Sequence, residues 1–129
     1  MRLAVLDDEK NCREAFNMIL NYHFTDLKTE EYSNGDEFCA AVSRGDTKID
    51  LLIADYGHPG KMGAQFFQFL VENKVTFPVL ILSAYVGGVP GLQQEIESTA
   101  GIFVRCLHKP FDVQAFRQAV IKAVSRIQT

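Results

Sequence analysis

The chain has 129 residues, of which 47% are hydrophobic and 22% charged, and its formal net charge is −3 at pH 7. This length predicts one domain with one core, covering residues 1–129, and the composition is that of an ordinary globular protein. No apolar run approaches the roughly 20 residues of a membrane span, and no basic cluster suggests that this domain binds nucleic acid.

Targeting and cysteine usage both predict a cytoplasmic protein. The first residues enter a strand pattern at once, so we expect no signal peptide. Cys12, Cys39 and Cys106 lie in apolar patterns without CxxC or Cys/His spacing. They predict buried free thiols in a reducing compartment and disfavour a structural zinc site.

Strand patterns alternate with helical patterns along the whole chain. The predicted strands cover residues 2–6, 28–32, 51–55, 77–83 and 103–108. The second is polar and is expected at a sheet edge. The third is an unbroken apolar run bounded by turn residues, which suits a strand buried on both faces.

Each strand pattern is followed by helical spacing, the first of which begins at residue 11. Capping-box spacing from Ser33 or Asn34 predicts the start of the second helix, and Asp112 is expected to cap the last. Helix 63–73 is more apolar than one sheet-facing stripe needs, so it is either deeply covered or meets a partner. Helix 92–100 has a sparse apolar stripe and is expected to pack least firmly.

Five consecutive strand–helix units predict the fold class. Crossovers between parallel strands are right-handed, so the units give a parallel sheet with helices on both faces, a three-layer α/β sandwich. No GxGxxG follows the first strand, which disfavours dinucleotide binding.

Polar residues gather where the predicted strands end, and parallel strands end at one edge of a sheet. They are Asp7, Asp8, Asp55, Ser83 and Lys109. Two carboxylates 4 Å apart repel by about 1 kcal/mol in water and about 4 kcal/mol at an effective dielectric of 20. Oxygen ligands favour a hard ion such as Mg²⁺, and an ammonium opposite it would help to hold a phosphoryl group. Carboxylates themselves can accept phosphoryl groups.

In this arrangement the chain resembles the receiver domains of two-component response regulators over essentially its whole length. The matching residues are the acidic pair Asp7 and Asp8, then Asp55 with Pro59 and Gly63, then Ser83 with Ala84, and finally Lys109, Pro110 and Phe111. The resemblance implies a flavodoxin-like (βα)5 fold with strand order 2-1-3-4-5.

The resemblance implies that Asp55 accepts a phosphoryl group from the phosphohistidine of a histidine kinase or histidine phosphotransfer protein. It implies Mg²⁺, or Mn²⁺, held by the carboxylates of Asp7, Asp8 and Asp55 and by the backbone carbonyl of Gly57. Such a protein is not a turnover enzyme, although it can lose its own phosphoryl group.

The switch that the resemblance implies involves Ser83, Ala84 and Lys109, which would contact the phosphoryl group and report it to helix four, strand five and helix five. The Lys109–Pro110 bond is expected to be cis. A downstream protein target or an attached effector domain would receive the signal, and phosphorylation could drive homodimerisation; no membrane partner is expected.

Several positions depart from the family pattern. Cys106 stands where receivers carry an aromatic switch residue, so the usual coupling to the strand-five surface is open to question. His58 replaces the usual Met before Pro59. Gly57 cannot position an attacking water and Tyr85 would shield the site, which predicts slow loss of the phosphoryl group.

Other interpretations stay open at this point. A pseudo-receiver would keep the fold as a protein-interaction module without a working switch. A phosphatase with an Asp nucleophile after strand one would resemble Asp-x-Asp, whereas this chain has Asp7-Asp8-Glu9. Asp8 could be only a helix cap, and His58 and His108 could join a transition-metal site, although no His spacing supports it.

Overall fold

The computed structural model describes residues 1–45, 47–56, 64–73, 75–83 and 102–127, and the structural statements below concern these ranges. Strands and helices alternate along them, as expected. The elements are β1 (Arg2–Leu6), α1 (Lys10–His23), β2 (Lys28–Tyr32), α2 (Gly35–Ser43), β3 (Leu51–Tyr56), α3 (Ala64–Glu72), β4 (Val79–Ser83), β5 (Val104–His108) and α5 (Val113–Val124).

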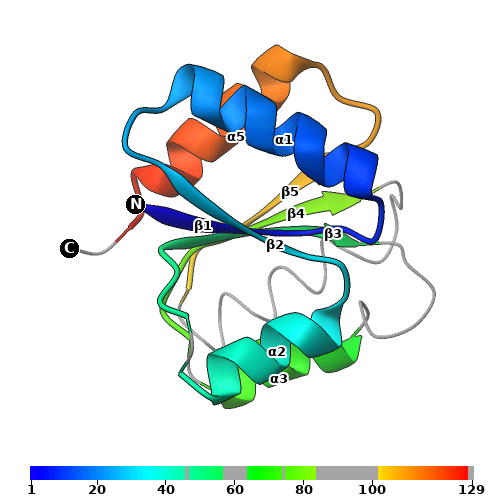
Figure 1. Ribbon diagram of the computed structural model, residues 1–129, viewed down its shortest axis with the longest axis vertical. Helices are drawn as coiled ribbons and strands as arrows, with labels where there is room; N and C mark the ends of the chain where they lie inside the picture. Colours follow the sequence, from blue (N-terminus) through cyan, green and yellow to red (C-terminus); the bar gives the residue numbers. More distant parts are fainter. Residues whose placement is uncertain (46, 57–63, 74, 84–101, 128–129) are drawn as a thin grey trace.

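The five strands form one parallel sheet in the order β2-β1-β3-β4-β5. Figure 1 shows α1 and α5 over one face of this sheet, and α2 and α3 over the other. The predicted flavodoxin-like α/β sandwich is therefore confirmed. The polar strand β2 does lie at an edge of the sheet, as its composition indicated.

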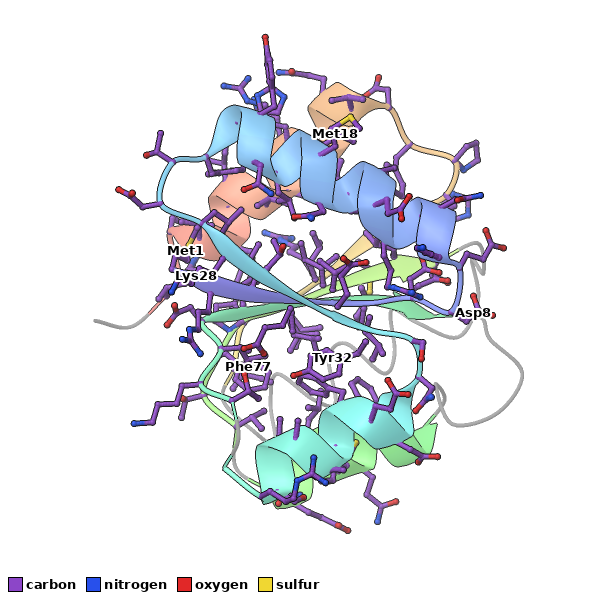
Figure 2. The ribbon with its side chains drawn as sticks, in the orientation of Figure 1. Met1, Asp8, Met18, Lys28, Tyr32 and Phe77 are labelled. Atoms are coloured by element: carbon purple, nitrogen blue, oxygen red, sulfur yellow. The ribbon has the colours of Figure 1, made fainter. Side chains whose placement is uncertain are left out.

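Two hydrophobic clusters fill the space on either side of the sheet, because successive strand residues point to opposite faces. In β3, Leu51 and Ile53 join the cluster under α1 and α5, while Leu52 and Ala54 join the one under α2 and α3. Tyr32 lies between the sheet and α2 in Figure 2. All four of these β3 residues are at most 1% exposed, so the third strand is buried on both faces as predicted.

The predicted strand 77–83 was two residues too long. The ladder begins at Val79 because Pro78 has no backbone N–H to donate, although its carbonyl still accepts from Leu52 N at 3.0 Å. The last strand likewise begins at Val104 rather than at residue 103.

Both expected helix caps are present. Asn34, rather than Ser33, caps α2 by accepting a hydrogen bond from the Glu37 N–H at 2.9 Å. Asp112 caps α5 by accepting from the Ala115 N–H at 2.7 Å.

Asp8 is not a helix cap. The N-cap of α1 is Glu9, whose side chain makes no capping hydrogen bond, and the helix starts at Lys10, one residue before the predicted start.

The apolar side chains of α3 that the structure describes are largely covered within the domain. Phe66 and Leu70 are buried, and Phe69 and Val71 are partly buried against the same cluster. For these four residues the covered alternative is confirmed; the side chain of Phe67 lies outside the described part of the chain. None of the described helices has the length and apolar content needed to span a lipid bilayer.

The cysteines correct one expectation. Cys12, Cys39 and Cys106 are free thiols, but each is only partly buried, because all three lie at the margins of the hydrophobic clusters.

Candidate functional site

Buried polar side chains collect at one edge of the sheet. Within the described residues they belong to Asp7, Asp55 and Ser83, whose exposed fractions for the whole residue are 2%, 5% and 2%. Asp7 directly follows β1, Asp55 is the second-last residue of β3, and Ser83 is the last residue of β4. The carboxyl ends of parallel strands thus bring together residues that lie far apart in the sequence.

Three carboxylates form a compact group at this edge. Asp7, Asp8 and Asp55 can each offer an oxygen such that all three atoms lie within 4.8 Å of one another. Asp7 and Asp55 are buried, whereas Asp8 is exposed and lies at the outer end of β1 in Figure 2. Because the donors are all oxygens and one side is open to solvent, the group fits a hard, partly hydrated divalent cation such as Mg²⁺.

Lys109 supplies a positive charge beside one of these carboxylates. Its Nζ lies 2.6 Å from Oδ1 of Asp55, and the two side chains are 32% and 7% exposed. Its backbone N–H donates to the carbonyl of Ser83 at 2.7 Å. This hydrogen bond connects the start of the loop between β5 and α5 to the end of β4. The Lys109–Pro110 peptide bond is cis, as the resemblance implied.

The loop that carries the acidic pair is held by three hydrogen bonds to Asp7. Its N–H donates to the carbonyl of Tyr32 at 3.1 Å, continuing the pairing of β1 with β2. Its Oδ1 accepts from the Glu9 N–H at 2.9 Å, and its carbonyl accepts from Arg13 Nη1 at 2.7 Å. From the sequence, Arg13 and Glu9 were not identified as residues that hold this loop. The sequence signal for such a role was an Arg placed about a turn and a half after an acidic pair.

The thiol of Cys12 lies beside this loop. It donates to Oε2 of Glu9 at 3.3 Å. Burial first, and then this hydrogen bond, raise the pKa of Cys12 to about 11, and the charges of Asp7 and Glu9 act in the same direction. The thiol is therefore neutral at physiological pH and has little nucleophilic character.

Cys106 occupies the middle of β5, opposite Ile81 of β4. Its side chain is partly buried against the cluster under α2 and α3. The position is thus a small side chain packed at the margin of the core.

Several predicted site positions lie outside the described residues, so the structure does not test the roles predicted for them. They are Gly57, His58, Pro59, Gly63, Ala84, Tyr85 and the helix expected over 92–100. Of the described residues, the potential metal ligands that come together are carboxylates, and the exposed His108 is not among them. The described part of the site therefore gives no support to a His-containing transition-metal centre.

Comparisons with known proteins agree on one family. A sequence model described as "Response regulator receiver domain" matches residues 3–121. The chain is similar in structure to a response regulator receiver protein from Burkholderia phymatum, with 25% identity, a TM-score of 0.73 and coverage of 96% of this chain and 94% of that one.

Two further solved structures show the same fold. A response regulator receiver domain protein from Clostridium thermocellum has 20% identity and a TM-score of 0.75, covering 97% of this chain and 94% of that one. The chemotaxis protein CheY4 of Vibrio cholerae has 18% identity and a TM-score of 0.72, covering 95% and 97%. A search of curated proteins found no match.

Proposed function

We propose, from the premise that this chain belongs to the family of response regulator receiver domains, that Asp55 accepts a phosphoryl group from a phosphohistidine. The donor would be a histidine kinase or a histidine phosphotransfer protein in the cytoplasm. One observation carries the proposal: the buried Asp55 carboxylate lies close to two acidic neighbours and also pairs with the Lys109 ammonium at 2.6 Å.

Asp55 is the acceptor in this proposal because it has both kinds of neighbour, acidic carboxylates and an ammonium. A carboxylate oxygen of Asp55 attacks the phosphorus, an O–P bond forms and the P–N bond to the donor imidazole breaks. The electron pair of the P–N bond goes to the imidazole nitrogen, so the donor leaves as a neutral histidine once it has taken a proton. The low exposure of Asp55, 5%, limits water access to the acceptor.

The carboxylates of Asp7, Asp8 and Asp55 would hold Mg²⁺. When bound, the ion would offset their mutual repulsion and the negative charge on the transferring phosphoryl oxygens. Asp7 is fixed by backbone contacts and Asp8 is exposed, so the pair combines a rigid ligand with one that can adjust as the donor approaches.

Lys109 has a second role in the proposal. Its ammonium, 32% exposed, pairs with Asp55 before transfer and would turn to the phosphoryl oxygens after it. The Ser83 hydroxyl, at the end of the neighbouring strand, would donate to another phosphoryl oxygen. The Lys109 N–H donates to the Ser83 carbonyl, and this hydrogen bond would couple the movement of the two residues.

The output would be a change in the surface formed by helix four, β5 and α5, read by a protein target or by an attached effector domain. One observation favours a second candidate. Cys106 is a small side chain in β5 and cannot move an aromatic ring between two positions, so a pseudo-receiver that binds partners without this switch is the alternative.

Acetyl phosphate with MgCl₂, followed by mass spectrometry of the intact protein, tests the proposal. Wild type should gain the mass of one phosphoryl group, and Asp55→Asn should gain none. Asp50→Asn is a matched control, because Asp50 directly precedes β3 and accepts from the Arg2 N–H at 2.8 Å; it should react like wild type. No mass gain in wild type would favour the pseudo-receiver.

A further inference from the structure

We propose that Arg13 is a positioning residue of the metal site, which holds the loop carrying Asp7 and Asp8 in the geometry that binds Mg²⁺. The inference rests on the proposed function, since it concerns the same carboxylates. Arg13 makes two contacts at once: Nη1 donates to the Asp7 carbonyl at 2.7 Å, and Nε donates to Oε1 of Glu31 at 3.2 Å.

These contacts join three elements that meet at the carboxyl edge of the sheet. Arg13 lies in α1, Asp7 in the loop after β1, and Glu31 in the edge strand β2. The Arg13 side chain is only 14% exposed, whereas that of Glu31 is 36% exposed, so it is the guanidinium that is shielded from solvent. A planar guanidinium presents several N–H groups in fixed directions, which suits two acceptors on different elements.

The consequence for Asp7 is that most of its freedom is removed. The Tyr32 carbonyl and Arg13 hold its peptide groups on either side, and the Glu9 N–H holds one carboxylate oxygen. A buried carboxylate fixed in this way needs little further ordering when it binds a cation. Residues that orient metal ligands without touching the metal commonly change affinity by 10- to 100-fold when they are replaced.

Charge alone predicts the opposite result, which makes the role of Arg13 testable. A cation beside an acidic site repels a second cation, so removing the guanidinium should tighten Mg²⁺ binding if Arg13 were only a nearby charge. If Arg13 positions the loop, its removal should weaken Mg²⁺ binding. The sign of the change therefore separates the two roles.

The experiment is a titration of the full chain with MgCl₂ at constant ionic strength, followed by backbone amide chemical shifts. We expect Arg13→Gln to weaken Mg²⁺ binding on the order of 10-fold. Arg13→Lys keeps the charge but cannot hold both acceptors with one planar group, so we expect an intermediate loss. It also serves if Arg13→Gln does not fold.

Arg2→Gln is the matched control. Arg2 pairs with Glu30 of the same edge strand at 3.6 Å, but at the other end of the sheet and with side chains 47% and 28% exposed. This variant should bind Mg²⁺ as wild type does. A loss as large as that of Arg13→Gln would mean that general destabilisation is responsible, and would overturn the proposal.

The remaining outcomes are equally decisive. Unchanged or tighter Mg²⁺ binding in Arg13→Gln, or in Arg13→Lys if only that variant folds, would overturn the positioning role and leave the proposed function intact. A wild-type protein whose amide shifts do not respond to MgCl₂ would contradict the metal site itself, and with it both proposals.

Discussion

The two ends of the sheet treat charge differently. At the amino end, Arg2 pairs with Glu30 at 3.6 Å, and both side chains are substantially exposed, at 47% and 28%. At the carboxyl end, Lys109 pairs with Asp55 at 2.6 Å, and Asp55 is only 7% exposed. The strand β3 begins directly after one acid, the partly buried Asp50, and carries the buried Asp55 as its second-last residue.

This contrast distinguishes exposed surface charges, which contribute little to stability, from buried charges that serve a functional site. Exposed ion pairs contribute about 0–1 kcal/mol to stability. Buried charges cost desolvation free energy, and a group of like charges adds repulsion to it. A chain that gathers such groups at one end of its sheet, and solvated pairs at the other, marks the first end as the functional one.

The largest expected effect on stability comes from breaking the ion pair at one end of the sheet and then, in a second variant, the pair at the other end. Lys109→Ala leaves Asp55 buried among carboxylates without its ammonium, so we expect a loss of about 1–3 kcal/mol in the free energy of unfolding, between the values for exposed and fully buried pairs. Arg2→Ala should lose no more than about 1 kcal/mol. Urea unfolding at pH 7 without Mg²⁺ measures both; equal losses would remove the distinction between the two ends.

A smaller effect should have the opposite sign. Asp8→Asn removes one charge from the acidic group without leaving a cavity, because Asp8 is exposed, and should raise the free energy of unfolding by about 1 kcal/mol without Mg²⁺. The same variant should lose most of the stabilisation that MgCl₂ gives wild type.

Asp26→Asn is the control for that substitution. Asp26 is exposed, precedes β2 at the other end of the sheet, and has a φ of 57°, which Asn tolerates well. Its stability and its response to MgCl₂ should match those of wild type. Thermal unfolding with and without MgCl₂ checks both variants, and a fall in stability for Asp8→Asn would argue against repulsion among the carboxylates.

The smallest contrast concerns two thiols. Burial is the main cause that raises the pKa of both Cys12 and Cys39 to about 11, but only Cys12 is also affected by charges of the acidic loop. Since the thiolate is the reactive form, alkylation by iodoacetamide should be slow at pH 8 and should speed up as pH rises toward 11. MgCl₂ should accelerate the reaction at Cys12 and leave Cys39 unchanged; peptide mass mapping measures each site, and equal responses would contradict this.

Much of the fold could be predicted because local patterns and tertiary structure agree. The polar composition of β2 predicted an edge strand, and the unbroken apolar run of β3 predicted burial on both faces. The predicted strand at 77–83 failed at its start because Pro78 ends the hydrogen-bond ladder, a constraint that the apolar pattern alone does not express.

The candidate site was predictable as a set of strand ends, but not in its supporting contacts. Parallel strands place Asp7 and Asp55 at one edge whatever the loops do. The contact between Arg13 and the Asp7 carbonyl depends on how α1 is oriented over the sheet. That orientation follows from packing between α1, the sheet and α5, which single-sequence periodicity does not specify.

The alternation that builds the two hydrophobic clusters continues into the polar residues beyond them. Leu51 and Ile53 belong to the cluster under α1 and α5, so by register Asp55 continues that side, whereas Val79 and Ile81 belong to the other cluster and Ser83 continues theirs. At this edge the sheet is a single layer of strands, so only the strand backbones separate its two faces. Asp55 and Ser83 therefore lie at the same rim of the sheet but face opposite layers of the sandwich.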